Sequence, residues 1–154
     1  MSMVCFTFDV PRNSWLSMND RKHRQDAARR TATLRADAAF YGWQLKKRLA
    51  VGVDEYRDAD GVLRAFARYA SADWPLWNAE RPCQYVAVIG WPTARRSDSD
   101  NAMPTVKALL DGLVDAGLMA DDADAVIWRR SFARDTHKAR KGFHRVRIEI
   151  WDAK

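Results

Sequence analysis

The sequence predicts a single α+β domain, in which a mixed sheet of about four to five strands packs against two main helices. Three observations support this fold class. Short apolar runs typical of strands occur near both ends and in the middle of the chain, and two longer stretches have apolar residues at helical spacing. The length of 154 residues is that of one domain, which buries about two thirds of the surface exposed by the unfolded chain.

The first strand is predicted over residues 3–10, where apolar and polar residues alternate, and Pro11 ends it. Asn19 or Asp20 is then expected to cap a long helix. The apolar residues of this helix recur at three- and four-residue spacing: Ala27, Thr31, Leu34, Ala38, Tyr41, Leu45 and Leu49.

Residues 52–82 give the weakest pattern, and we interpret them as an insertion. A turn is predicted at residues 58–61, and residues 62–69 are long enough for two helical turns. Trp74 and Trp77 follow and are expected to be exposed. Two interpretations of these rings stay open: they pack onto the core or across a dimer interface, or they stack on unpaired DNA bases.

The second half of the chain predicts a strand, a helix and two further strands. Residues 83–91 are apolar on both faces, as in a central strand. A helix is expected to begin near Pro104 and to end at Gly117. The apolar stripe predicted for it consists of Met103, Val106, Leu110, Leu113, Val114 and Gly117. Strands are predicted over residues 125–132 and at the end of the chain, the last with three residues facing inward: Val146, Ile148 and Ile150. Cys5 and Cys83 lie within strand-like runs and are expected to be buried free thiols.

An acidic cluster lies between the central strand and the following one, in a protein of net charge +6. Residues 98–124 contain seven carboxylates and one cation, Lys107. Asp98 and Asp100 are two residues apart, so an extended backbone would direct both to one side. Lys107 falls on the apolar stripe of the helix, so its ammonium is expected to reach toward a partner, with Asp98 and Asp100 the nearest candidates.

Carboxylates clustered without Cys or His favour Mg²⁺ or Mn²⁺ over zinc. In a basic protein, the substrate that such a site predicts is a phosphodiester. Lys107 is a candidate for stabilising the charge that develops in the transition state. The alternative interpretation is that these aspartates are helix caps and solubilising surface charges.

The segment Asp98-Ser99-Asp100-Asn101, with Lys107, Asp111-Gly112-Leu113 and Asp121-Asp122 after it, resembles the core motif of RusA-type Holliday junction resolvases. The resemblance covers residues 95–124 and weakens outside them. It implies a small dimeric endonuclease that cuts four-way DNA junctions with Mg²⁺ or Mn²⁺. By position, it implies that Asp98, Asp100 and Asp122 bind metal and take part in catalysis, with Lys107 as the catalytic lysine. The link from Asn101 to Lys107 is longer than in the shortest members, and residues 52–82 have no clear counterpart.

Two basic segments flank the acidic cluster. Residues 12–48 contain ten Lys and Arg against three Asp, and residues 129–147 contain eight against one. Such faces are either simply solvated or contact DNA phosphates, in which case binding weakens steeply with salt. The candidate DNA-binding residues are Arg21, Lys22, Arg24, Arg29, Arg30, Arg95, Arg96, Arg134, Lys138, Arg140 and Lys141. His23, His137 and His144 are scattered singly and are expected at the surface or facing DNA.

Two classes of function follow. The first is a structure-selective endodeoxyribonuclease that resolves Holliday junctions by metal-dependent phosphodiester hydrolysis, with paired symmetric nicks. Because such a junction has approximate two-fold symmetry and needs two cuts, a C₂ homodimer is expected. The second is a non-catalytic DNA-binding or architectural protein. Neither needs an organic cofactor or a membrane, and no apolar stretch approaches the roughly 20 residues that span a bilayer, so we expect a protein of the bacterial or phage-infected host cytoplasm.

Overall fold

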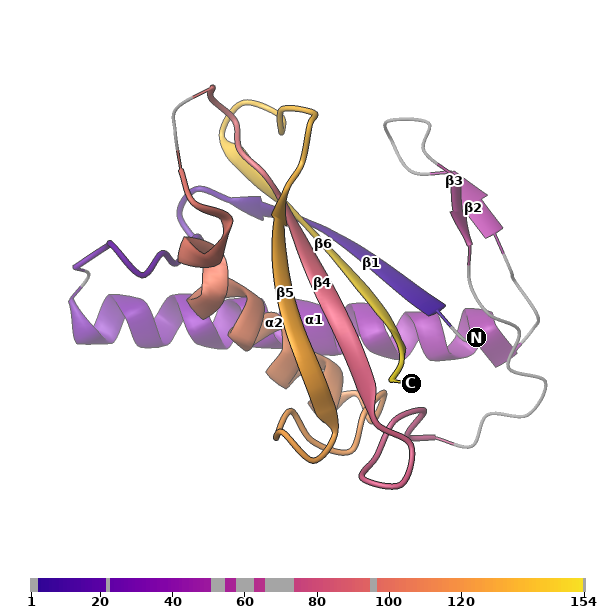
Figure 1. The fold of residues 1–154 in the computed structure, drawn as a ribbon. Helices are drawn as coiled ribbons and strands as arrows, with labels where there is room; N and C mark the ends of the chain where they lie inside the picture. The colour runs from indigo at the N-terminus through magenta and orange to yellow at the C-terminus, as the bar shows by residue number, and fades with distance from the viewer. Residues whose placement is uncertain are drawn as a thin grey trace.

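The computed structural model describes residues 3–21, 23–50, 55–57, 63–65, 74–94 and 97–153. It contains a mixed four-stranded sheet, a separate two-stranded sheet and two α-helices (Figure 1). This confirms the predicted α+β class. In chain order the elements are β1 (Met3–Pro11), α1 (Arg24–Ala50), β2 (Glu55–Arg57), β3 (Leu63–Ala65), β4 (Cys83–Gly90), the 3₁₀ helix η1 (Ser99–Ala102), α2 (Met103–Asp115), β5 (Ile127–Arg134) and β6 (Phe143–Asp152).

The main sheet has the strand order β1-β6-β4-β5. β6 is antiparallel to both β1 and β4, whereas β4 and β5 are parallel. Parallel neighbours need a long crossover connection, and residues 91–126, with η1 and α2, provide it. Because β4 has a strand on each side, the prediction of a central strand over residues 83–91 is confirmed.

Both helices cover the same face of the main sheet (Figure 1). Phe6, Ile148 and Ala87 lie opposite one another on adjacent strands and are fully buried. Leu34 of α1 and Leu109 of α2 belong to the same buried cluster. The three inward-facing residues predicted for the last strand are all fully buried. The apolar core thus lies between this face and the two helices, and the crossover loops gather at the ends of the strands.

The helices α1 and α2 approach each other closely at Gly112. A Cβ atom at this position would lie 2.3 Å from the carbonyl oxygen of Arg35 and 2.6 Å from the Cβ of Ala38. No larger residue fits there without movement of the α1 backbone. Gly112 belongs to the motif that carries the family resemblance, and its role in the structure is to pack the two helices.

The end of α2 is set by Gly117, as predicted. Its φ angle is +75°, which disfavours residues with a side chain. The amide of Gly117 donates to the carbonyl oxygen of Val114 at 2.8 Å, and the amide of Leu118 donates to that of Leu113 at 3.0 Å. This is the Schellman arrangement, which satisfies carbonyl groups that a helix end leaves free.

The predicted start of α1 was wrong. The helix begins at Arg24, and His23 precedes it: the His23 carbonyl oxygen accepts from the Ala27 amide at 2.9 Å. Asn19 and Asp20 instead lie in the preceding turn. That turn is held by tertiary contacts, which override the local capping preference of the two side chains.

The expectations for residues 52–82 are partly corrected. Leu63–Ala65 is a strand paired with β2, not a helical turn, and the predicted turn at residues 58–61 lies outside the described residues. Trp77 is fully buried, and its indole N–H donates to Asp152 Oδ1 at 2.9 Å. Trp74 is half-buried, with the Lys46 ammonium 5.2 Å from its ring centre. The interpretation that Trp77 packs onto the core is therefore correct, and it is not a surface for stacking bases.

Two further expectations concern thiols and membranes. Cys5 and Cys83 are free and buried, as predicted. Burial raises the pKa of the Cys83 thiol to about 12, so it stays protonated.

Neither helix in the described part of the chain combines the length and the apolar composition needed to cross a bilayer.

Candidate functional site

Asp98 and Asp100 lie where the chain leaves the central strand and enters α2. Asp98 has an extended backbone (φ −79°, ψ 134°), but Asp100 lies in the first turn of η1. The expectation that an extended backbone aligns the two carboxylates is therefore wrong. Both residues are exposed, and neither side chain has a hydrogen bond or ion pair to another described residue. η1 packs beside β5, where Arg134 donates to the Ser97 carbonyl oxygen at 3.3 Å.

Lys107 lies on α2 and bridges two carboxylates of the acidic cluster. Its Nζ atom donates to Asp111 Oδ1 at 2.8 Å, one helical turn away, and to Asp122 Oδ2 from the loop before β5. The structure thus brings together three of the residues in the motif. The expected partners Asp98 and Asp100 are not the ones that Lys107 contacts. The side chain of Lys107 is 57% exposed, so the prediction that it lies on the apolar stripe is also wrong.

The buried side of α2 is shifted from the predicted stripe because the helix packs against both α1 and the sheet. Thr105, Ala108, Leu109 and Gly112 are buried as well as the predicted residues Val106, Leu110 and Leu113. Met103, which was predicted on the stripe, is 41% exposed. This shift turns Lys107 toward solvent and toward the loop that carries Asp122.

The ion pairs fix the charge states of this cluster. The hydrogen bonds that Lys107 donates to Asp111 and Asp122 raise the pKa of Lys107, so its ammonium stays protonated at neutral pH. The Lys107 hydrogen bond lowers the pKa of Asp122, which stays ionised. Arg130 of β5 holds the same loop: it donates to the Asp122 carbonyl oxygen at 2.7 Å and pairs with Asp124 at 2.7 Å.

A second ion pair joins the acidic cluster to α1. Arg35 Nη2 lies 2.7 Å from Asp115 Oδ1, and a second nitrogen of Arg35 contacts the other carboxylate oxygen. This contact lowers the pKa of Asp115. The carboxylates of Asp111 and Asp122 also favour the charged form of Arg35. Sequence reasoning missed this cation because Arg35 and Asp115 are 80 residues apart.

The chemistry of the predicted metal ligands fits a hard divalent cation, since all of them are carboxylates. Asp98 and Asp100 are exposed and have no ion pair with another described residue, whereas Asp122 is ion-paired with Lys107. Within the described ranges, no three His, Cys, Asp or Glu side chains lie close enough together to hold a metal ion. A cation that uses Asp122 as well as Asp98 and Asp100 therefore needs these segments to move closer together.

The predicted DNA-binding residues fall into three groups. The exposed residues are Arg21, Arg24, Arg29, Arg134, Lys138, Arg140 and Lys141. Arg30 is engaged within the protein: it pairs with Asp26 at 2.9 Å and donates to the carbonyl oxygens of Arg12 and Trp15. Lys22, Arg95 and Arg96 lie outside the described residues.

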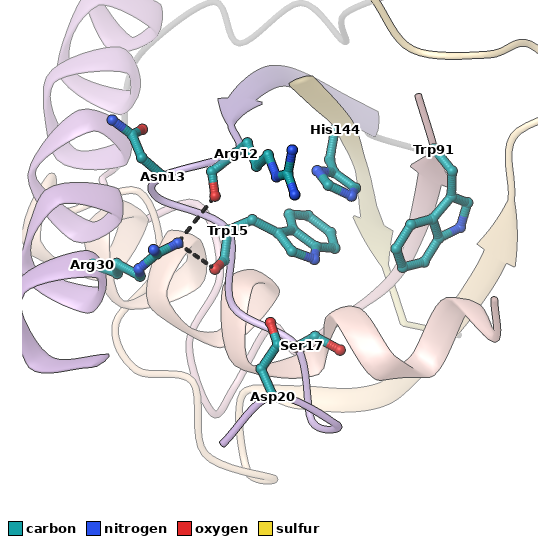
Figure 2. A pocket seen from close by; sticks show the side chains of 8 residues that line it. All are labelled: Arg12, Asn13, Trp15, Ser17, Asp20, Arg30, Trp91 and His144. Atoms are coloured by element: carbon teal, nitrogen blue, oxygen red, sulfur yellow. Dashed lines mark hydrogen bonds between the residues drawn. The ribbon is translucent and has the colours of Figure 1, made fainter. Parts of the chain in front are cut away.

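A cavity of about 730 Å³ that sequence reasoning missed lies beside η1 (Figure 2). Its walls come from the loop after β1, from Arg30 of α1, from the residue after β4 and from β6. The His144 ring stacks on the Trp15 ring, with centroids 3.9 Å apart and planes 7° apart. Trp91 meets both rings edge to face. A second cavity of about 400 Å³ shares Arg12 and His144 with the first.

His144 is therefore part of an aromatic cluster, and it is half-buried rather than at the surface as expected. Burial, followed by the charge of the nearby Arg12, lowers the pKa of His144 to about 4. Its ring is neutral at pH 7. The sequence does not predict this cluster, because Trp15, Trp91 and His144 come from three separate segments that share no periodic pattern. The one local signal is that Trp91 directly follows the central strand.

Hydrogen bonds tie one wall of the cavity to the acidic cluster. The Met18 amide donates to the Asn101 carbonyl oxygen at 2.9 Å. The Thr105 hydroxyl accepts from the Leu16 amide at 2.9 Å and donates to the Leu16 carbonyl oxygen at 2.8 Å. The loop that carries Trp15 is thus fixed to η1 and to the start of α2.

Comparison of the chain with models of known protein families gives no match, and a search of curated proteins also gives none.

Proposed function

We propose that the protein is a metal-dependent endodeoxyribonuclease that acts on branched DNA, with the four-way Holliday junction as its substrate. The observation that carries this proposal is the bridge from Lys107 to Asp111 and Asp122. It joins two separate parts of the motif that resembles RusA-type resolvases. Asp98 and Asp100, which are exposed and pair with no other described residue, lie at the start of the same helical segment.

The charge distribution supports a phosphodiester substrate. The protein has a net charge of +6, and exposed cations lie both before α1 and in the loop between β5 and β6. These cations are suited to neutralising DNA phosphates on either side of the acidic cluster. Carboxylates alone would repel the DNA backbone, so the cluster needs a cation when it meets a phosphodiester.

Each residue of the proposed site has a separate role. Asp98, Asp100 and Asp122 would hold Mg²⁺ or Mn²⁺, and the bound ion would activate water and neutralise the charge on the leaving oxygen. Lys107 is protonated, so it is not a general base. Its ammonium holds Asp122 in the free protein and would donate a hydrogen bond to a phosphate oxygen of the substrate. Asp111 keeps Lys107 oriented from one helical turn away.

The substitution Asp100→Asn tests this assignment. The expected result is loss of cleavage with junction binding unchanged or tighter, because a charge that repels phosphate is removed. Asp100 is exposed and has no ion pair with another described residue, so the variant is expected to keep its fold. Gel-shift titration in EDTA measures binding, and nicking of the same junction in Mg²⁺ measures cleavage. Asp37→Asn on the exposed surface of α1 is the matched control. Unfolding of Asp100→Asn, or cleavage at the wild-type rate, would rule out its assignment as a ligand.

Two symmetric cuts on opposing strands need two sites, so the proposal includes a C₂ homodimer. Such a homodimer would have a dimeric mass in solution and would make paired nicks in one binding event. The proposed setting is the cytoplasm of a bacterium or of a phage-infected host, where branched DNA is found.

A second candidate is a non-catalytic, basic DNA-binding protein. It is favoured by one observation: the described residues contain no group of three side chains close enough to hold a metal ion. On this hypothesis the aspartates serve only to form ion pairs with Lys107, Arg35 and Arg130. DNA affinity would then be indifferent to Mg²⁺, and no strand would be cut with either Mg²⁺ or Mn²⁺.

A further inference from the structure

The aromatic cavity beside η1 has no role in the chemistry of Asp98, Asp100, Lys107 and Asp122. It is nevertheless joined to that site by the hydrogen bonds from Met18 to Asn101 and from Leu16 to Thr105. We infer that this cavity binds one unpaired nucleotide of the DNA substrate, with the base against Trp91 and His144 and the phosphate at Arg12 and Lys141. The inference rests on the proposed function and names the part of the substrate that the site recognises.

The first argument is the shape and chemistry of the walls. Trp15, Trp91 and His144 contact one another through their rings, and the imidazole lies parallel to the Trp15 indole (Figure 2). Trp91 and His144 are only half-buried, so parts of both rings face the cavities that they line. A neutral imidazole and an indole offer π surfaces on which any nucleobase can stack. A cavity of about 730 Å³ is large enough for a nucleotide.

The second argument is the placement of the cations. Arg12 and His144 line both cavities, and Lys141 lines the second one. Arg12 and Lys141 are exposed, and their side chains make no ion pair with other described residues. A guanidinium that lines both cavities and an ammonium that lines the second suit a phosphate attached to a base. Asp20 also lines the first cavity, on the side toward the start of α1.

The third argument is that hydrogen bonds to the surrounding structure hold the walls of the cavity in place. Arg30 of α1 is partly buried and donates to the carbonyl oxygens of Arg12 at 3.0 Å and Trp15 at 3.1 Å. The Arg12 amide donates to the Gly142 carbonyl oxygen at 3.0 Å, and the Ala139 amide donates to that of Trp91 at 2.9 Å. The backbone of each wall is therefore held in place, so little ordering is needed when a ligand binds.

Double-stranded DNA keeps its bases stacked inside the helix, so a single-base cavity selects DNA in which a base is already unpaired. Unpairing costs least for a base that is mismatched, damaged or already single-stranded. Stacking beside η1 would fix the neighbouring phosphate relative to the acidic cluster. One interpretation of the sequence was that Trp74 and Trp77 stack on unpaired bases. Because Trp77 is fully buried, we assign this stacking to Trp91 and His144 instead.

The test compares two ligands of equal length and charge, a deoxythymidine decamer and the same decamer with abasic sites throughout. Binding is measured in EDTA by quenching of tryptophan fluorescence and by anisotropy of a 5′ label. The wild type is expected to bind the decamer with bases about tenfold or more tightly than the abasic one. Trp91→Leu should remove this preference, and Arg12→Gln and Lys141→Gln should weaken binding of both ligands alike.

Two variants serve as controls. Trp128→Leu removes a ring that is 65% exposed on β5, and Arg81→Gln removes a cation that pairs with Asp152, away from the cavity. Both should retain the preference for bases. Arg12 and Lys141 are exposed, so their variants test the cavity even if Trp91→Leu fails to fold.

Equal binding of the two decamers by the wild type would overturn the inference, as would an unchanged preference in folded Trp91→Leu. Loss of the preference in Trp128→Leu would place the stacking surface elsewhere and would also overturn it. Because the assay needs no metal and no cutting, its outcome is separate from that of the nuclease proposal. If the protein prefers the decamer with bases but cuts no DNA, the nucleotide-binding inference stands and the nuclease proposal is rejected. If it cuts junctions without a base preference, the nuclease proposal stands and the inference about the cavity is rejected.

Discussion

The substitution Lys107→Met separates a structural role of the Lys107 bridge from a catalytic one. Methionine keeps most of the length of the side chain and removes its charge. It therefore removes the hydrogen bonds to Asp111 and Asp122 while α2 keeps its helical propensity. The two roles predict effects of very different size on stability and on cleavage.

The expected effect on stability is small. The side chain of Lys107 is 57% exposed, and those of Asp111 and Asp122 are 23% and 22% exposed, so solvent screens both pairs. Exposed ion pairs each contribute about 0.2–1 kcal/mol, and the loss of both should cost about 1 kcal/mol. For a domain of this size, that lowers Tm by about 2–4 °C.

The expected effect on cleavage is much larger. Removing one donor that stabilises transition-state charge typically lowers the rate by about 10²–10³-fold, or about 3–4 kcal/mol in the barrier. Thermal unfolding gives the first quantity, and single-turnover nicking of a four-way junction in Mg²⁺ gives the second. Arg81→Met is the matched control, since it removes a partly exposed cation that pairs with Asp152 at 3.1 Å, away from α2. It should leave cleavage unchanged.

Two results would refute this reasoning. Cleavage by Lys107→Met within about threefold of the wild type would remove Lys107 from the catalytic machinery. A loss of more than about 3 kcal/mol in the free energy of unfolding would show that the bridge is mainly structural, because it exceeds what screened pairs contribute.

Three further predictions concern packing, pH and salt. Gly112→Ala should lower the free energy of unfolding in urea by about 1–2 kcal/mol, because the 2.3 Å approach to the Arg35 carbonyl oxygen outweighs the gain of about 1 kcal/mol in helix propensity. Ala36→Gly on the exposed side of α1 calibrates that propensity, and a stabilised Gly112→Ala would contradict the close approach. The pKa of His144 is about 4 in the folded protein and about 6.5 when unfolded, so only the unfolded state gains this proton as the pH falls between those values. Stability should therefore fall below pH 6.5, by about 1–2 kcal/mol after allowance for partial exposure, and His144→Phe should flatten this dependence; equal slopes in both proteins would refute it. Junction affinity in EDTA should fall steeply between 50 and 200 mM salt, and a flat dependence would exclude phosphate contacts by the exposed cations.

The parts of the fold that could be predicted from the sequence are those set by local signals. Pro104 and Gly117 bound α2 because a proline fits only the first turn and a glycine readily adopts positive φ. The largely apolar stretch from Cys83 predicts a central strand, and β4 lies between β6 and β5 in the sheet. The start of α1 was missed because the turn at Asn19 is bonded to η1 rather than to its own helix.

The candidate site could be predicted only in part, because its contacts are not local. The bridge from Lys107 to Asp111 spans one helical turn, and the spacing alone allows it. The bridge to Asp122 depends on the course of the loop before β5, and Arg35 reaches Asp115 from another helix. Trp15 and His144 stack only because β1 and β6 are neighbours in the sheet. No periodicity in the sequence encodes that pairing.

The measurement that most directly tests the proposed nuclease is cleavage of a labelled mobile four-way junction, with linear duplex as the control, in Mg²⁺ and in EDTA. The proposal predicts paired symmetric nicks on the junction alone, lost in EDTA and lost in Asp98→Asn. Tight junction binding without any cutting in Mg²⁺ or Mn²⁺ would contradict it, and would leave the acidic cluster as a structural partner of Lys107 in a DNA-binding protein.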